Sequence, residues 1–436
     1  MKFTHSSIIQ ISIMVAFLAL MLSACKPDPV DPDDPNAGFL ASEVDALGDI
    51  DLGGFTVPSS YDIDGALAPG AYNGQIRRIA QLKEIVDSSR NEPIKWDIAN
   101  AMEVGGLDGV FRSAAAMNTA TSSSDLRSKI DELNYDNGNT SVADAFAALA
   151  DEFVASTQAN YTVTASNGTA GMIATGDKKR HVSAKGLEYA QILEKGMYGP
   201  LLYDQMVDDY LRPGQAGIDN DKGNNESAVD NYSSNGTDRQ HRWDEAFGYF
   251  GADPATYPNL GNTSTGDGIF MSNYTFDFSD ETETAFGINL AQKAMDAFIL
   301  GRSALKAGQG FGPGDESTNE AVFNAARADI KLYVEAGLAA AAFHYLNDAI
   351  ADITDEDKLH HLSEALGFIY SLSFNSEGRL TASEAHDVLK ALGWSSSDAS
   401  LNGIYEINLW EVTDAQMESA RSILNESFPG FSDIPF

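Results

Sequence analysis

The sequence is poor in cysteine and in basic residues. Cys25 is the only cysteine among 436 residues, so no disulfide can form within the chain and C-x-x-C metal or redox motifs are excluded. Lysine and arginine number 28 against 64 aspartates and glutamates, a formal charge of −36. Such a chain repels nucleic acid and anionic membrane surfaces and favours cations. The same acidity also promotes solubility, and by itself it identifies no ligand.

Common catalytic motifs are missing as well. The chain contains no H-E-x-x-H, no G-x-S-x-G and no phosphate-binding G-x-x-x-x-G-K-[ST]. The usual metalloprotease, serine hydrolase and nucleotide-enzyme functions therefore lose support, and we expect a protein that is not an enzyme.

The N-terminus carries the clearest apolar run of the chain. One basic residue, Lys2, precedes an apolar stretch from Ile8 to Leu22, which is shorter than the roughly twenty residues that a transmembrane helix needs. The run ends in Leu-Ser-Ala-Cys at 22–25, typical of a lipobox. We therefore predict a signal peptide over residues 1–24 and membrane attachment through lipid on Cys25. The alternative is an ordinary signal peptide with an incidental cysteine.

Residues 25–60 are predicted to be a tether. Proline and aspartate dominate positions 26–35, a composition too polar and too stiff to pack into a core. Because cleavage removes only Lys2 among the charged residues, the mature chain has 27 basic against 64 acidic side chains. We predict a cell-envelope lipoprotein of the outer membrane, facing the periplasm or the cell surface.

The rest of the chain, residues 61–436, predicts an all-α helical bundle. Apolar residues recur at helical spacing in 76–86 and in 142–153, while alternating strand patterns are scarce. Further helices are expected at 183–211, 239–250, 282–307, 319–350, 356–373, 381–392 and 413–427.

An internal repeat is predicted from two similar segments. Residues 241–250 and 360–369 both read H-x-x-x-E-A-apolar-G-aromatic-apolar. Upstream of them, 193–197 (LEKGM) and 334–338 (VEAGL) are also related. We therefore predict two related helical repeats, spanning about 170–300 and 320–436, whose glycines permit close helix contact.

The repeated motif predicts a metal site. Residues four apart on a helix lie one turn apart on the same face, so His and Glu side chains can meet there. Imidazole and carboxylate together suit a divalent ion such as iron or zinc. The candidate ligands are His241, Glu245, His361, Glu364, Glu194 and Glu335, with Asp244 and His360 as competing members of each pair.

Shared ligation requires the donor atoms of both copies to lie within about 4 to 5 Å of one another. In the alternative interpretation, each His/Glu pair is a partly buried hydrogen-bonded pair that fixes helix packing. His344 is predicted to be a packed core histidine and not a ligand.

With these residues in view, the chain resembles a family of envelope lipoproteins catalogued as a domain of unknown function. The resemblance runs from about Tyr72 to the C-terminus. It is carried by Gly74-Gln75 with Arg78 and Leu82, by 176–179 (GDKK), 186–189 (GLEY), 194–196 (EKG), 241–251, and 361–372.

More distantly, the chain is similar to imelysin-like proteins. These consist of two related helical bundles and are linked to iron uptake. In their G-x-H-x-x-E motif the histidine and glutamate correspond to His361 and Glu364, and to His241 and Asp244 in the other copy, although Leu359 and Arg239 replace the glycines. The resemblance implies a metal-related function and also suggests a metallopeptidase.

Three functions follow from these observations. The leading hypothesis is a non-enzymatic envelope lipoprotein that binds a metal ion or metal-bearing ligand between the two repeats, with a link to iron uptake. The second is a peptide- or glycan-binding scaffold that uses Trp243 and the long polar loops beside it, with structural His/Glu pairs. The third is a metallopeptidase, which rests on the imelysin-like resemblance alone.

Overall fold

The computed structural model of the protein describes residues 46–48, 58, 60–61, 72–89, 126–131, 141–176, 178–213, 218, 236–253, 270–307, 318–395, 404 and 406–436. The predicted signal peptide, Cys25 and the tether up to residue 45 lie outside the described residues.

The described chain is helical apart from one small hairpin. The helices are α3 (Asn73–Ser89), α6 (Leu126–Asp131), α7 (Ser141–Asn160), α8 (Tyr189–Met197), η1 (Tyr198–Tyr203), η2 (Gln205–Tyr210), α10 (Asp238–Phe250), α11 (Met271–Asp277), α12 (Ser279–Phe286), α13 (Leu290–Ala307), α14 (Thr318–Ala351), α15 (Asp355–Leu372), α16 (Ala382–Ala391), η4 (Leu409–Glu411), α17 (Asp414–Ser427) and η5 (Phe431–Asp433). Strands β1 (Gly171–Thr175) and β2 (Lys178–Val182) pair antiparallel. The predicted all-α helical bundle is confirmed.

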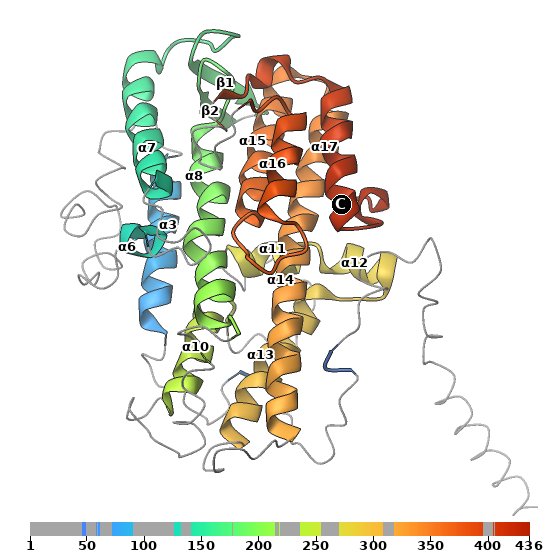
Figure 1. The fold of residues 1–436 in the computed structure, drawn as a ribbon. Coiled ribbons are helices and arrows are strands. Elements are labelled where there is room, and N and C mark those ends of the chain that lie inside the picture. The colour runs from blue at the N-terminus through green and yellow to red at the C-terminus, as the bar shows by residue number, and fades with distance from the viewer. Residues whose placement is uncertain are drawn as a thin grey trace, which may run out of the picture.

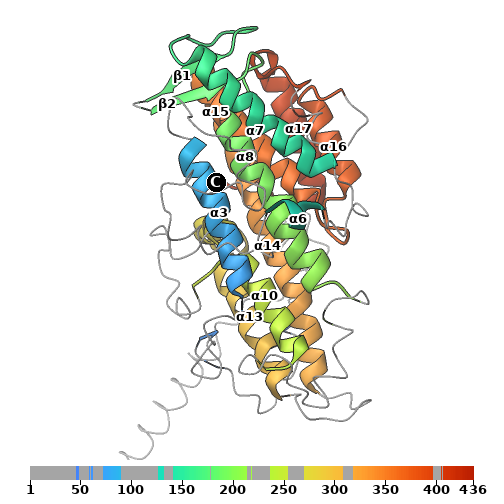
Figure 2. The same ribbon diagram turned by 90° about the vertical axis from the view of Figure 1, so that its left-hand side faces the viewer.

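The bundle is built around three helices. α15 packs against both α8 and α14, and α14 also packs along α13. In Figure 1, α3 and α7 lie on one side of this centre and α16 and α17 on the other, while the hairpin lies at one end of the bundle. Figure 2, turned by 90°, places α10 and α13 at the end opposite the hairpin. None of the described helices is long and apolar enough to cross a membrane.

Small residues let the central helices approach closely. The run 339–342 of α14 consists of four alanines, all fully buried. A Cβ atom on Gly337, just before this run, would lie 2.7 Å from Oγ1 of Thr275 in α11. Likewise, a Cβ on Gly367 of α15 would lie 2.5 Å from Cβ of Lys195 in α8. These contacts position α14 and α15 against their neighbours without room for a larger side chain.

Helix α8 continues into two π-helical segments because its hydrogen-bond ladder is interrupted. Pro200 has no N–H to donate to Gly196, and Gly199 donates its N–H to Oγ of Ser371 at 2.8 Å. The same hydroxyl donates to the carbonyl of Lys195 at 2.5 Å. Ser371 of α15 thus takes the place of one intrahelical bond of α8, an insertion that widens the helix locally.

The structure corrects two predicted helix boundaries and adds a hairpin that was not predicted. The helix expected at 282–307 is divided into α12 and α13, because Gly287 ends α12 in a left-handed conformation with φ 71°. The helix expected from residue 183 begins at Tyr189. The β1–β2 hairpin was not predicted, since the exposed basic residues of β2 give its sequence little strand-like alternation.

Replacing Ser371 with alanine is expected to destabilise the bundle by about 1 to 3 kcal/mol, because two buried backbone groups of α8 lose their partner. The hydroxyl of Ser373 is a matched control, since it donates to the Tyr370 carbonyl of its own chain segment at 2.6 Å. Urea unfolding of Ser371→Ala and Ser373→Ala measures the difference. Equal losses in the two variants would show that the interhelical bridge contributes nothing.

Candidate functional site

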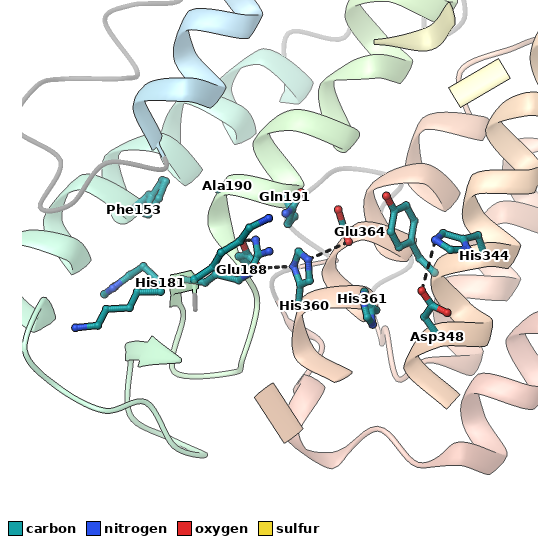
Figure 3. A pocket seen from close by; sticks show the side chains of 14 residues that line it. Phe153, His181, Glu188, Ala190, Gln191, His344, Asp348, His360, His361 and Glu364 are labelled. Carbon is teal, nitrogen blue, oxygen red and sulfur yellow. Dashed lines mark hydrogen bonds and ion pairs between the residues drawn. The ribbon is translucent and has the colours of Figure 1, made fainter. Parts of the chain in front are cut away.

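A cavity of about 700 Å³ lies between α7, the hairpin, α8, α14 and α15 (Figure 3). Most of its lining side chains are titratable. They are Lys178, Lys179, Arg180, His181, Glu188, His344, Tyr345, Asp348, His360, His361 and Glu364, joined by Phe153, Ala190 and Gln191. Such a gathering of ionisable groups around a hollow is typical of a binding or active site.

Three of these residues form a group suited to a metal ion. His360, His361 and Glu364 each offer one ligand atom, and the three atoms lie within 4.8 Å of one another. All three belong to α15, where the four-residue spacing places Glu364 one turn after His360. His360 Nε2 lies 3.3 Å from Glu364 Oε2. Since ligand atoms about 2.1 Å from one ion lie roughly 3 to 4 Å apart, small side-chain rotations would bring the group around an ion.

Each of the two imidazoles is oriented by a carboxylate. His360 Nδ1 lies 2.7 Å from Oε2 of Glu188, just before α8, and His361 Nδ1 lies 2.8 Å from Oδ2 of Asp352, just before α15. In a neutral ring that donates from Nδ1, the other nitrogen, Nε2, is the one left to bind a metal. Metal-binding histidines in proteins almost always have such an outer partner.

Glu188 is itself held in place on two sides. Its second carboxylate oxygen, Oε1, lies 3.0 Å from the Arg180 guanidinium of β2. Its backbone N–H donates to Oγ of Ser363 in α15 at 2.9 Å. The hairpin, the start of α8 and α15 are therefore joined at this one residue.

A buried lysine lies behind the cavity. Lys195 Nζ lies 2.9 Å from Glu194 Oε2, 3.3 Å from Glu364 Oε1 and 2.8 Å from the Gln191 side-chain oxygen. Burial alone would lower the pKa of Lys195, but the carboxylates of Glu194 and Glu364 outweigh it, and the pKa is raised. Lys195 is therefore a fixed cation that holds one oxygen of Glu364, while the other oxygen faces His360.

The apolar wall of the cavity contains a neutral histidine. The His181 ring lies beside the stacked rings of Phe153 and Tyr189, with ring centroids 6.2 and 6.0 Å away. Its Nε2 forms a hydrogen bond with Ser156 Oγ at 2.9 Å. Burial lowers the pKa of His181 to about 4. At neutral pH the ring contributes packing and no charge.

The first copy of the motif forms a separate cluster on α10. His241 Nε2 lies 3.7 Å from Glu245 Oε2, and Glu245 accepts a hydrogen bond from the Gln75 amide at 2.9 Å. Burial raises the pKa of Glu245, although His241 and Gln75 oppose the shift. Asp244 is engaged elsewhere, since it accepts hydrogen bonds from Arg302 at 2.8 Å and from the Tyr61 hydroxyl at 2.7 Å.

The six predicted ligands are therefore not brought together. Among the described residues, the only group of three or more potential ligands contains neither His241 nor Glu245, and α10 lies at the other end of the bundle from the hairpin (Figures 1 and 2). Glu335 is also away from the cavity, where its Oε1 accepts the backbone N–H groups of Arg379 and Leu380. The predicted convergence of the two copies is wrong.

Within the second copy, the structure rearranges the predicted pair. Glu364 faces His360, which was the competing member, while His361 pairs with Asp352. Glu194 reaches the site only through Lys195. The predicted role of the glycines is confirmed, because Gly248 and Gly367 both lie at close helix contacts: a Cβ on Gly248 would lie 2.6 Å from Tyr72 Cβ.

Two other predictions need correction. His344 lines the cavity with a side chain that is 28% exposed, and its Nε2 lies 3.4 Å from Asp348, so it is not a packed core histidine. Trp243 is fully buried and its indole N–H donates to the Phe298 carbonyl, so it cannot serve as a glycan platform. The polar-loop residues 219–235 lie outside the described chain.

Glu188, Asp352 and Arg180 belong to the site but were not predicted. Glu188 comes from a segment far from α15 in sequence, and no local spacing connects the two. One signal was present, however: the stretches 176–179 and 186–189, on which the family resemblance rests, both contribute to the cavity lining.

The fold and the site together define an all-α bundle protein with a cavity beside its central helix α15, lined mostly by titratable side chains. Comparison with protein-family models matches residues 61–426 to the family described as a domain of unknown function, DUF4856. The chain belongs to this family, which confirms the predicted resemblance. No curated protein and no solved structure gives a significant match, and the relation to imelysin-like proteins stays a prediction.

The stability of the protein is expected to fall between pH 6.5 and pH 4 in part because of His181. The unfolded chain takes up a proton near pH 6.5, whereas the folded ring does so only near pH 4, so this contribution is complete above pH 6.5 and lost as the pH falls through that window. The loss should be about 3 kcal/mol and absent in His181→Gln. Urea unfolding across this pH range measures it, with His386→Gln on α16 as control. Parallel profiles for His181→Gln and wild type would contradict the assignment.

Replacing Lys195 with methionine should cost about 3 to 5 kcal/mol, because it leaves the buried carboxylates of Glu194 and Glu364 without their cation. Lys331 provides a matched control: its partner Glu377 has a side chain that is 47% exposed, so Lys331→Met should cost about 1 kcal/mol or less. Chemical denaturation at pH 7 compares the two. A loss in Lys195→Met as small as that in the control would show that the carboxylates do not need this cation.

Proposed function

We propose that this protein is a lipid-anchored cell-envelope protein that binds a divalent transition-metal ion through His360, His361 and Glu364. The ion occupies the edge of the cavity on α15, and the helical bundle holds its ligands. The membrane attachment belongs to the same proposal and rests on the sequence of residues 1–25.

One observation carries the metal proposal above all: each histidine of the group has a carboxylate on its Nδ1 atom, Glu188 for His360 and Asp352 for His361. A histidine that serves only packing needs no particular tautomer. Two neighbouring histidines held in the same tautomer, beside a third potential ligand, are the arrangement that metal binding requires.

The donor set indicates which ions fit. Two imidazole nitrogens and one carboxylate oxygen suit zinc, iron(II) or manganese, and they disfavour calcium and magnesium, which prefer oxygen ligands alone. Three protein ligands also leave at least one coordination position for water or an added ligand. Because the group lines the cavity, that position is accessible to a molecule bound there.

Lys195 sets the charge of the site. In the absence of an ion, one oxygen of Glu364 contacts Lys195 and the other faces His360. A bound ion would take the place of the weaker His360 contact, while Lys195 keeps the other oxygen and so fixes the orientation of the carboxylate. The Lys195 ammonium repels a metal ion bound nearby. The site therefore favours an ion that binds strongly to imidazole nitrogen over one that is attracted by negative charge alone.

The proposal is tested by comparing the metal content and metal affinity of the wild-type protein with those of Glu364→Gln. Protein purified without chelator is analysed for bound zinc, iron and manganese, and each ion is then titrated calorimetrically. Glu364→Gln should lose affinity by about 100-fold. Glu188→Gln should lose it by about 10-fold, because Glu188 is no ligand but orients His360, besides pairing with Arg180. Glu245→Gln is the matched control, because Glu245 also follows a histidine by four residues on a helix but lies outside the group.

Failure of every ion to bind wild-type protein more tightly than millimolar would overturn the proposal. So would equal loss of affinity in Glu245→Gln and Glu364→Gln. Thermal unfolding of each variant shows whether a lost affinity comes from a lost fold.

A further inference from the structure

Each carboxylate of the cavity lining contacts a neighbouring basic side chain or imidazole. Glu188 contacts both Arg180 and His360, Glu364 contacts Lys195 and His360, and Asp348 lies beside His344.

Two lysines of the cavity lining, in contrast to these acids, contact no charged partner among the described residues. Lys178 and Lys179 are exposed at the start of β2 and border the cavity. Within the described part of the chain, neither side chain has an ion-pair or hydrogen-bond partner. In a protein with 64 acidic against 28 basic residues, two adjacent lysines that pair with none of the described carboxylates form a local positive site at the rim of the cavity.

The hairpin that carries these lysines is fixed relative to the metal-binding group. Arg180, two residues after Lys178, donates from Nε to Thr175 Oγ1 at 2.6 Å across the hairpin, and its guanidinium contacts Glu188. Glu188 in turn contacts His360. The lysines and the group on α15 therefore line the same cavity from two elements that are joined through Glu188.

We propose that the cavity binds a small ligand bearing an oxyanion, a carboxylate or a phosphate, which Lys178 and Lys179 hold by charge. The proposal rests on the proposed function for its second contact, in which an oxygen of the same ligand fills the open coordination position of the ion on α15. Positive charge on both sides of the cavity, from the lysines and from the ion, then selects an anion over a neutral or cationic molecule.

The test titrates zinc-loaded and zinc-free protein with inorganic phosphate and with succinate, using succinamide as the uncharged probe. Wild-type zinc-loaded protein should bind phosphate or succinate, more weakly at high salt, and should not bind succinamide. The double variant Lys178→Gln/Lys179→Gln should bind the anion about 10-fold or more weakly. Its zinc affinity should stay within about 3-fold of wild type, because neither lysine is a ligand.

The control is Lys306→Gln/Lys390→Gln, which makes the same charge change at two exposed lysines of α13 and α16 outside the cavity lining. Its anion affinity should equal that of wild type. Binding of phosphate alone assigns a phosphate-bearing ligand, and binding of succinate alone assigns a carboxylate.

The inference is overturned if neither anion binds, if succinamide binds as well as succinate, or if both double variants lose the same affinity. These outcomes are independent of the metal proposal. Zinc binding by wild type without any lysine-dependent anion binding removes the anion site alone, whereas lysine-dependent anion binding without zinc binding supports the anion site and removes the metal site.

Discussion

The close contact between α8 and α15 is the constraint on which the site depends. Gly367 lets the backbone of α15 come against Lys195, and Ser371, one turn later, enters the hydrogen-bond ladder of α8. Only at this separation does the buried ammonium of Lys195, which pairs with Glu194 of its own helix, also reach Glu364 of α15. A buried lysine is costly unless it is paired, so the same contact that packs the helices also fixes the orientation of Glu364 toward the cavity.

Most of the fold follows from local pattern. The apolar stripes at 76–86 and 142–153 correspond to α3 and α7, because helical periodicity depends only on neighbours within a few turns. The expected helix at 282–307 was wrong at Gly287, where one left-handed residue ends α12 although the apolar pattern continues. The β1–β2 hairpin was not predicted because β2 begins with exposed basic residues, so its sequence shows no clear alternation of apolar and polar side chains.

The site was only partly predictable. The motif identified Glu364 and both histidines of α15, since one helix carries all three. It also suggested that the similar pair on α10 would join them, but similarity of two segments does not determine where the fold places them. Glu245 instead accepts hydrogen bonds from Gln75 of α3 and Tyr210 of η2. Glu188, the partner of His360, precedes a different helix, and no spacing in the sequence relates the two residues.

The two carboxylates that orient the histidines differ greatly in their distance along the chain. Asp352 lies nine residues from His361, whereas Glu188 lies 172 residues from His360. Loop closure makes the first contact available as soon as the α14–α15 turn forms, while the second requires α8 to dock onto α15. The tautomer of His360 is therefore set only in the assembled bundle. The candidate metal site is therefore completed only late in folding. A chain in which α14 and α15 alone have packed together holds the His361 ring in its orientation, but not yet the ring of His360.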